Sequence, residues 1–414
     1  MRESSERTDT TKIVEASRAG VAAAGAAPGR SRDLKRLLTF LLALALPASV
    51  SAADLPVPPD VSSVPVSMLV DLGSGEVLVS HRADVSFLPA SVTKVMSTYV
   101  AFEEIGAGRL ALNRSFVVPP EISRDWFAKG TTMYLKPNQV VDTDGLLHGL
   151  MTASANDAAM VLAHGYAGSV DTWTLMMNDA ARRLGMTHSH YNTPNGWMDD
   201  GQTFVSARDL VRLADAMTMR YPQLYKHFSG QKTYKWQYVS MRSHDPTVGV
   251  IPGADGIKTG YTREAGYNFL GSAERGGRRL VMVLAGARTH FDRDAVARAL
   301  LEWGFTQWRA YPLVSKGGTV ARAEVQDGAS TSVPLIANRA LYATVPRYGR
   351  ARVSMKLHYH GPLVAPVAKG TRVADAEVLV DGVESSRIPL YAAQDVPVAG
   401  IFARMRNGLL NLFA

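Results

Sequence analysis

The sequence predicts an α+β protein in which a mixed region of helices and strands precedes a smaller all-β region. After Pro89, apolar residues recur at helical spacing as far as residue 104. Residues 253–262 have the composition of a turn that enters a short strand. Beyond Trp308 apolar and polar residues alternate, for example over residues 352–357, which is typical of half-buried strands. We therefore expect a mixed domain over residues 54–310 and a β-rich domain over residues 311–396.

The N-terminal segment has the composition of an export signal. Basic residues 30–36 precede a ten-residue apolar run, 37–46, which is followed by small residues at 47–53. The apolar run is too short to span a bilayer. We predict a signal peptide over residues 30–53, cleaved after Ala52 or Ala53. Residues 1–29 are rich in Ala, Ser and Arg, and we expect either a disordered extension or a start site assigned too far upstream.

Composition excludes several classes of function. The 414 residues contain no cysteine, so the chain has no disulfide and no thiolate metal site. The net charge is +8, but no basic run is interleaved with aromatic residues, and we predict no nucleic-acid partner. His188 and His190 are close in sequence but lack a third ligand nearby, so we predict no metal and no cofactor.

The first motif, Ser91-Val-Thr-Lys94, lies at the start of the predicted helix. Residues three apart share a helix face, so the Lys94 amine can reach the Ser91 hydroxyl and act as its base. A lysine serves as a base near neutral pH only if burial or a nearby cation lowers its pKa, and Lys258 could be that cation. The alternative is that Ser91 caps the helix and Lys94 is solvated.

The second motif, Ser154-Ala-Asn156, lies in a stretch of small residues between two helix-like runs. We predict a tight loop in which the Ser154 hydroxyl relays a proton to the leaving amine. The Asn156 amide would hold a backbone carbonyl of the substrate. The alternative is that both side chains cap the helix that follows.

The third motif, Lys258-Thr-Gly260, lies in the predicted strand. Gly260 has no side chain, so a substrate strand can lie close against this edge, where Lys258 and Thr259 offer a cation and a hydroxyl to a carboxylate. The backbone N–H groups of Ser91 and Tyr261 are the expected oxyanion-hole pair. The three motifs follow one another at separations of 63 and 104 residues, and together they predict an active-site-serine acyltransferase.

These motifs resemble those of the low-molecular-mass penicillin-binding proteins that are D-alanyl-D-alanine carboxypeptidases. The resemblance covers roughly residues 60 to 414 and includes a hairpin over 64–82 and the segments 89–96, 154–158, 206–210, 255–262 and 265–268. It implies a penicillin-binding/β-lactamase-like catalytic domain, with a five-stranded antiparallel sheet and a helical cluster, followed by the β-rich domain. It also implies the D-Ala-D-Ala end of the peptidoglycan stem peptide as substrate and β-lactam antibiotics as covalent inhibitors.

The resemblance further implies an arginine that helps to hold the terminal carboxylate. Arg293 matches by position, with Arg288 as second choice, and the alternative is a surface arginine that opens a helix over 292–308. Two departures stand out. Tyr261 occupies a position where histidine is common in the family, and residues 241–253 do not follow the usual asparagine-containing pattern, which leaves their role open.

Three other functions compete with the carboxypeptidase. Class A β-lactamases use a glutamate between the second and third motifs, whereas this chain has no glutamate from Ile122 to Arg263. A peptidoglycan D,D-endopeptidase of similar design usually lacks a β-rich tail domain. A cell-wall-binding protein with an inactive site would be expected to have lost Ser91 or Lys94, and both are present.

The C-terminal residues 397–414 are predicted to form an amphipathic membrane-anchor helix. At about 100° per residue, Ile401, Phe402, Met405, Leu409, Leu412 and Phe413 share an arc of about 120°. Such a helix can lie in the headgroup region, and the alternative is a helix docked on the β-rich domain. The resemblance favours the membrane. We expect a periplasmic enzyme attached peripherally to the outer face of the inner membrane.

Overall fold

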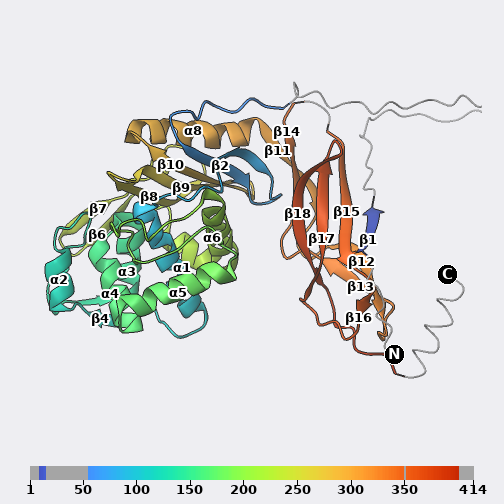
Figure 1. The fold of residues 1–414 in the computed structure, drawn as a ribbon, viewed down its shortest axis with the longest axis horizontal. Coiled ribbons are helices and arrows are strands. Elements are labelled where there is room, and N and C mark those ends of the chain that lie inside the picture. Colours follow the sequence, from blue (N-terminus) through green and yellow to red (C-terminus); the bar gives the residue numbers. More distant parts are fainter. Residues whose placement is uncertain (1–8, 15–54, 349–350, 401–414) are drawn as a thin grey trace, which may run out of the picture. The chain divides into compact units, whose positions relative to one another are not determined.

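The computed structural model describes residues 9–14, 55–348 and 351–400, which belong to two compact units (Figure 1). The first unit contains Val57–Ser315 and Arg339–Arg347, and the second contains Lys316–Asn338 and the described residues before Val57 and from Tyr348 onward. We expected the β-rich domain to begin at residue 311, whereas in the structure the first unit extends to Ser315 and also includes Arg339–Arg347. Strand β14 (Leu341–Pro346) returns to the first unit because it pairs with β11 (Trp308–Val314).

The first unit is built on the five-stranded antiparallel sheet that the resemblance implies. Its order is β3-β2-β10-β9-β8, and its strands are β2 (Val66–Asp71), β3 (Val77–His81), β8 (Ala254–Thr262), β9 (Gly266–Arg275) and β10 (Arg278–Ala287). The hairpin expected over 64–82 is the β2–β3 pair. Along β10, Leu280, Met282 and Leu284 face one core, and Val281, Val283 and Ala285 face the other. The sheet is therefore buried on both faces.

Helices cover the two faces of this sheet unequally (Figure 1). Helix α8 (His290–Thr306) lies along one face, where Val296 and Leu300 pack against the sheet. The helices on the other side are α1 (Lys94–Gly106), α2 (Pro120–Trp126), α3 (Thr143–His148), α4 (Asn156–Ala167), α5 (Val170–Arg183), α6 (Ala207–Arg220) and α7 (Pro222–Phe228). Short hairpins accompany them: β4 (Ser115–Val117) with β5 (Val140–Asp142), and β6 (Thr233–Trp236) with β7 (Val239–Arg242).

Helix α6 illustrates how the sequence sets these helices. The Ser206 side chain caps its N-terminus by accepting from the Asp209 N–H, and Arg220 lies in its last turn. Leu210, Leu213 and Met217, spaced at three and four residues, are almost fully buried. This apolar stripe packs the helix on the core that it shares with the sheet.

The second unit is all-β, as predicted. Its sheet has the order β1-β15-β17-β18-β13-β12-β16, with strands β1 (Asp9–Val14), β12 (Thr319–Gln326), β13 (Ser332–Ile336), β15 (Val353–His360), β16 (Leu363–Val364), β17 (Arg372–Val380) and β18 (Val383–Ala392). On β15, Met355, Leu357 and Tyr359 are buried and their neighbours are not, which matches the predicted alternation.

Strand β1 corrects one expectation. Residues 9–14 lie within the segment 1–29 that we expected to be disordered, yet they form a strand that pairs antiparallel with β15. The β-branched residues Thr10, Thr11, Ile13 and Val14 favour an extended backbone, and β15 offers an edge with which to pair.

Two predicted segments fall outside the described residues. They are the signal peptide over 30–53 and all but the first residues of the anchor helix over 397–414. Among the residues that the structure does describe, no helix combines the length and the apolar character needed to cross a bilayer.

Candidate active site

Ser91 and Lys94 meet at the junction between a 3₁₀ helix, η2 (Ala90–Thr93), and α1, which Lys94 opens. Residues three apart eclipse one another in a 3₁₀ helix, so the two side chains lie on one face. The Lys94 Nζ atom is 2.8 Å from Ser91 Oγ. Lys94 has no exposed surface, which excludes the alternative of a solvated lysine.

The surroundings of Lys94 suit a neutral amine. Its Nζ atom also lies 2.8 Å from Asn156 Oδ1 and 2.8 Å from the Asn195 carbonyl oxygen. A neutral amine has two hydrogens and one lone pair, so it can donate to those two acceptors while its lone pair faces the Ser91 hydroxyl. Burial lowers the pKa of Lys94 well below 10.5, the positive charge of Lys258 lowers it further, and Asp157 opposes the shift.

The second motif follows a π-helical turn, η3 (Gly149–Ala153). Ser154 adopts a left-handed conformation with φ of 61° and lines the cavity. The residue that precedes α4 is Ala155, and no side chain caps that helix, so the capping alternative does not hold. Both polar atoms of the Asn156 side chain have partners: its Oδ1 accepts from Lys94, and its Nδ2 donates to the Lys129 carbonyl at 2.8 Å. The remaining Nδ2 hydrogen is available for a substrate carbonyl.

The third motif lies on β8, the edge strand of the sheet, beside η2. Lys258 is 4% exposed, and its Nζ donates to the Thr259 carbonyl at 3.0 Å. Burial is the main cause that lowers the pKa of Lys258 to about 7, with Asp245 raising it and Arg293 lowering it. An incoming carboxylate would favour the charged form of this lysine.

Gly260 lets β8 approach the nucleophile closely. A Cβ atom at this position would lie 2.4 Å from the Pro89 carbonyl oxygen and 3.2 Å from the Ser91 backbone nitrogen. We therefore expect Gly260→Ala to push β8 away from Ser91 and lower kcat/KM for D-alanine release by roughly 100-fold. Steady-state kinetics on a soluble peptide would measure this loss. Gly276→Ala, in the turn between β9 and β10, places its Cβ in open space but strains a backbone with φ of 57°, so it is a control for a strained glycine change that does not push on Ser91. Equal losses in both variants would contradict the prediction.

Arg293, in the first turn of α8, lies in the cavity wall. It is 5% exposed, and its Nε donates to Asp294 Oδ1 at 2.8 Å. The alternative of a surface arginine is therefore wrong, because the fold turns this side of α8 toward the site. Arg288, the second choice, is exposed.

Residues of all three motifs line one cavity of about 530 Å³, whereas Lys94, Asn156 and Lys258 are buried outside its lining. Its lining combines all three motifs with residues from α8 and from the loops: Ser91, Gly130, Thr131, Ser154, His244, Thr259, Gly260, Tyr261, Tyr267, His290, Arg293 and Asp294. Tyr261 stacks on Tyr267 with ring centroids 4.2 Å apart, so the residue that replaces the common histidine forms part of an aromatic wall.

His244 is the main site residue that the sequence did not identify. It belongs to the segment 241–253, which does not follow the asparagine-containing pattern of the family. Burial first, and then the charges of Lys258 and Arg293, lower the pKa of His244, so a neutral imidazole faces the cavity near neutral pH. No local pattern marks this histidine; only the fold brings it beside Lys258.

Comparison with known proteins agrees with this geometry. Residues 54–289 match the family described as D-alanyl-D-alanine carboxypeptidase, and residues 308–398 match the C-terminal domain of penicillin-binding protein 5. D-alanyl-D-alanine carboxypeptidase DacA of Escherichia coli K12 is 31% identical over 400 residues, which cover 92% of this chain and 97% of that protein.

Solved structures agree as well. Penicillin-binding protein 5 from Haemophilus influenzae superposes with a TM-score of 0.72 at 27% identity, over 83% of this chain and 99% of that one. Penicillin-binding protein D2 from Listeria monocytogenes, solved in its ampicillin-bound form, superposes with a TM-score of 0.54 at 27% identity, over 59% of this chain and 98% of that one. The chain belongs to the D-alanyl-D-alanine carboxypeptidase family of serine hydrolases.

Proposed function

We propose that this carboxypeptidase removes the terminal D-alanine from peptidoglycan stem pentapeptides through an acyl-enzyme on Ser91. The contact that carries the proposal is the 2.8 Å separation between Nζ of the fully buried Lys94 and Oγ of the partly exposed Ser91. Neutral Lys94 takes the hydroxyl proton as Ser91 Oγ attacks the carbonyl carbon of the D-Ala-D-Ala bond. The backbone N–H groups of Ser91 and Tyr261 stabilise the oxyanion that forms.

Collapse of the tetrahedral intermediate then breaks the peptide C–N bond. The leaving amine of D-alanine needs a proton, which the Ser154 hydroxyl relays from the ammonium of Lys94. Water next attacks the ester carbonyl carbon while Lys94 takes its proton. The bond from that carbon to Ser91 Oγ then breaks, Lys94 returns the proton to Oγ, and the shortened peptide leaves. No metal or redox cofactor enters these steps.

The terminal carboxylate of the substrate is proposed to bind at Lys258, Thr259 and Arg293. Lys258 and Arg293 supply positive charge inside a mostly buried wall, where a charge-assisted hydrogen bond is stronger than in water. Two carboxylates lie near these cations: Asp294 is 2.7 Å from Arg293, and Asp245 acts on Lys258 from outside the cavity lining. This charge arrangement favours a peptide with a free C-terminus.

Mass spectrometry of purified protein incubated with a stem pentapeptide tests the proposal. We expect loss of one D-alanine and no cleavage of a cross-linked dimeric peptide. Cleavage of the dimer at an equal or higher rate would instead favour a D,D-endopeptidase. Pentapeptide amide, which lacks the terminal carboxylate, is the matched control and should react more slowly.

We expect penicillin to acylate Ser91 and to be released slowly. The reason is that no glutamate lies between residues 122 and 263 to activate the deacylating water. A chromogenic cephalosporin should give a burst equal to the enzyme concentration, followed by a slow steady rate. Rapid steady-state hydrolysis would favour a β-lactamase instead.

The export and attachment of the enzyme are also proposals. The signal-like segment 30–53 and the amphipathic residues 401–413 support a periplasmic enzyme on the outer face of the inner membrane. Deleting residues 401–414 should move the protein from the membrane fraction to the soluble fraction with activity on a soluble peptide retained. The deletion spares Ala399, whose N–H donates to the Asp327 carbonyl at 2.8 Å.

A single substitution can separate loss of the anchor from loss of the fold. Leu409→Asp places a charge on the apolar arc and should also release the protein from membranes, whereas Asn411→Asp, on the polar side, should not. Truncated protein that still sediments with membranes would contradict the anchor.

A further inference from the structure

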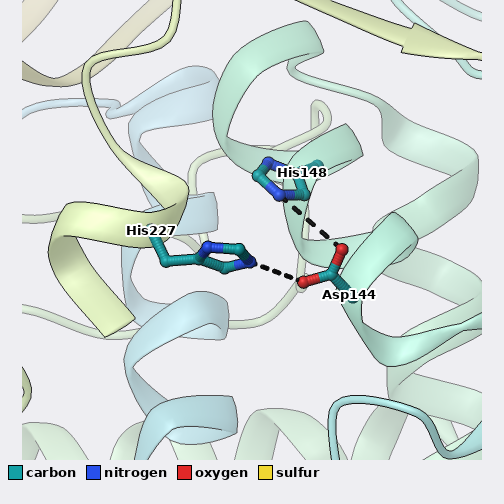
Figure 2. Close-up of side chains that lie close together, drawn as sticks. All are labelled: Asp144, His148 and His227. Atoms are coloured by element: carbon teal, nitrogen blue, oxygen red, sulfur yellow. Dashed lines mark hydrogen bonds and ion pairs between the residues drawn. The ribbon is translucent and has the colours of Figure 1, made fainter. Parts of the chain in front are cut away.

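Three polar side chains gather on the helical side of the first unit, on elements that the catalytic cavity does not use (Figure 2). Asp144 and His148 are four residues apart on α3, so they share one face of that helix. His227 reaches them from α7, and its Nε2 atom lies 2.7 Å from Asp144 Oδ1. The ligand atoms of all three lie within 4.8 Å of one another.

His148 is the member that ordinary packing does not explain. It is 7% exposed, yet its Nδ1 has no hydrogen-bond partner among the described residues. Its Nε2 points at Asp144 Oδ2 from 3.7 Å, which is too long for a hydrogen bond. A cation between the three side chains would take the lone pair of Nε2, the ring atom that faces Asp144 without a hydrogen bond, and would leave Nδ1 to carry the ring hydrogen.

The three donors are held in place by their neighbours. The His148 ring stacks on Tyr234 and lies against Phe228, each with a centroid separation of 4.8 Å. His227 and Asp144 are about half and one-third exposed, so an ion can enter from solvent and keep water as a further ligand. In a tetrahedral site with bonds of about 2.0–2.1 Å, donor atoms stand about 3.3 Å apart. The observed 2.7 and 3.7 Å bracket that spacing.

We propose that Asp144, His148 and His227 form a binding site for a divalent transition metal, with zinc as the best match. Two imidazoles and a carboxylate are a donor set that zinc accepts, with an open fourth position. The ion would tie α7 to α3, which leads through η3 directly to Ser154. The site is therefore a metal-dependent brace next to the second catalytic motif.

Cobalt(II) titration of tag-free full-length protein, dialysed against chelator, tests the site. We expect one equivalent to produce the visible absorption of four- or five-coordinate cobalt and one equivalent of zinc to abolish it. His227→Gln and Asp144→Asn each remove a ligand from a partly exposed position and should weaken binding by at least about tenfold. His81→Gln, an exposed histidine on the outer strand β3, is the control and should titrate like the wild type.

Two results would overturn the metal site. One is a wild-type titration that shows only the spectrum of hydrated cobalt. The other is unchanged binding in both His227→Gln and Asp144→Asn, which would place the ion elsewhere. Circular dichroism of each variant separates loss of a ligand from loss of the fold. The cobalt spectrum does not depend on peptidase activity, so this experiment tests the metal site separately from the proposed function.

Discussion

Ser91→Ala is expected to reduce D-alanine release by a factor on the order of 10⁴ or more and to abolish covalent labelling by a fluorescent penicillin. Without the Oγ atom no acyl-enzyme can form, and the remaining oxyanion donors and carboxylate-binding groups only hold the peptide. Release of D-alanine from a stem pentapeptide and gel fluorescence after labelling would measure the two losses.

Ser154→Ala is the matched control for this serine. It removes a hydroxyl from the same cavity but leaves Ser91 and Lys94 in place, so it should slow turnover while labelling persists. Peptide mapping of the penicillin adduct to Ser154, or labelling that survives in Ser91→Ala, would show that the nucleophile is wrongly assigned.

The second large effect is expected from Lys94→Ala. General bases contribute about 10² to 10⁴ in rate, and a base that acts together with its nucleophile is lost almost as completely as the nucleophile. The double variant Ser91→Ala/Lys94→Ala should therefore be no slower than Ser91→Ala alone. Lys94→Arg should not restore activity, because a guanidinium stays protonated and cannot accept the serine proton.

The pH profile of the wild type tests the same base. Lys94 works only when neutral, so kcat/KM should rise as pH increases through its pKa. Because burial and Lys258 lower that pKa, the rise should be complete well below pH 10.5. Lys258→Gln removes the neighbouring cation, so the rise in kcat should move to higher pH. A profile that stays in place in Lys258→Gln would argue against Lys94 as the titrating group.

The reacting residues could be predicted because their chemistry is local in sequence. Ser91 and Lys94 are three residues apart, and any helical turn places them together. The role of Lys258-Thr-Gly260 could be predicted once the motif was placed in a strand. The sequence could not show why Asn156 accepts from Lys94, since that contact depends on a left-handed residue at Ser154 and on the way α4 packs.

Residues supplied by tertiary packing were harder to predict. His244 enters the cavity because β8 and the loop before it fold beside α8, and nothing within residues 241–253 indicates this. Asp144, His148 and His227 were not predicted as a group, because His227 joins the other two only in the fold. The β-rich domain was correctly predicted from its alternation, whereas β14 was not assigned to the first unit because its partner β11 lies in a distant segment.

The pairing of β1 with β15 has a consequence for maturation. Cleavage after Ala52 or Ala53 would remove residues 9–14 together with the leader, which would leave β15 as an edge strand of the sheet in the mature β-rich domain. Its backbone N–H and C=O groups would then be open to recruitment by a strand from another polypeptide. Lys356, in the middle of β15, is a gatekeeper of the kind that discourages such recruitment. After cleavage, the charge of Lys356 rather than pairing with β1 would protect the edge of β15.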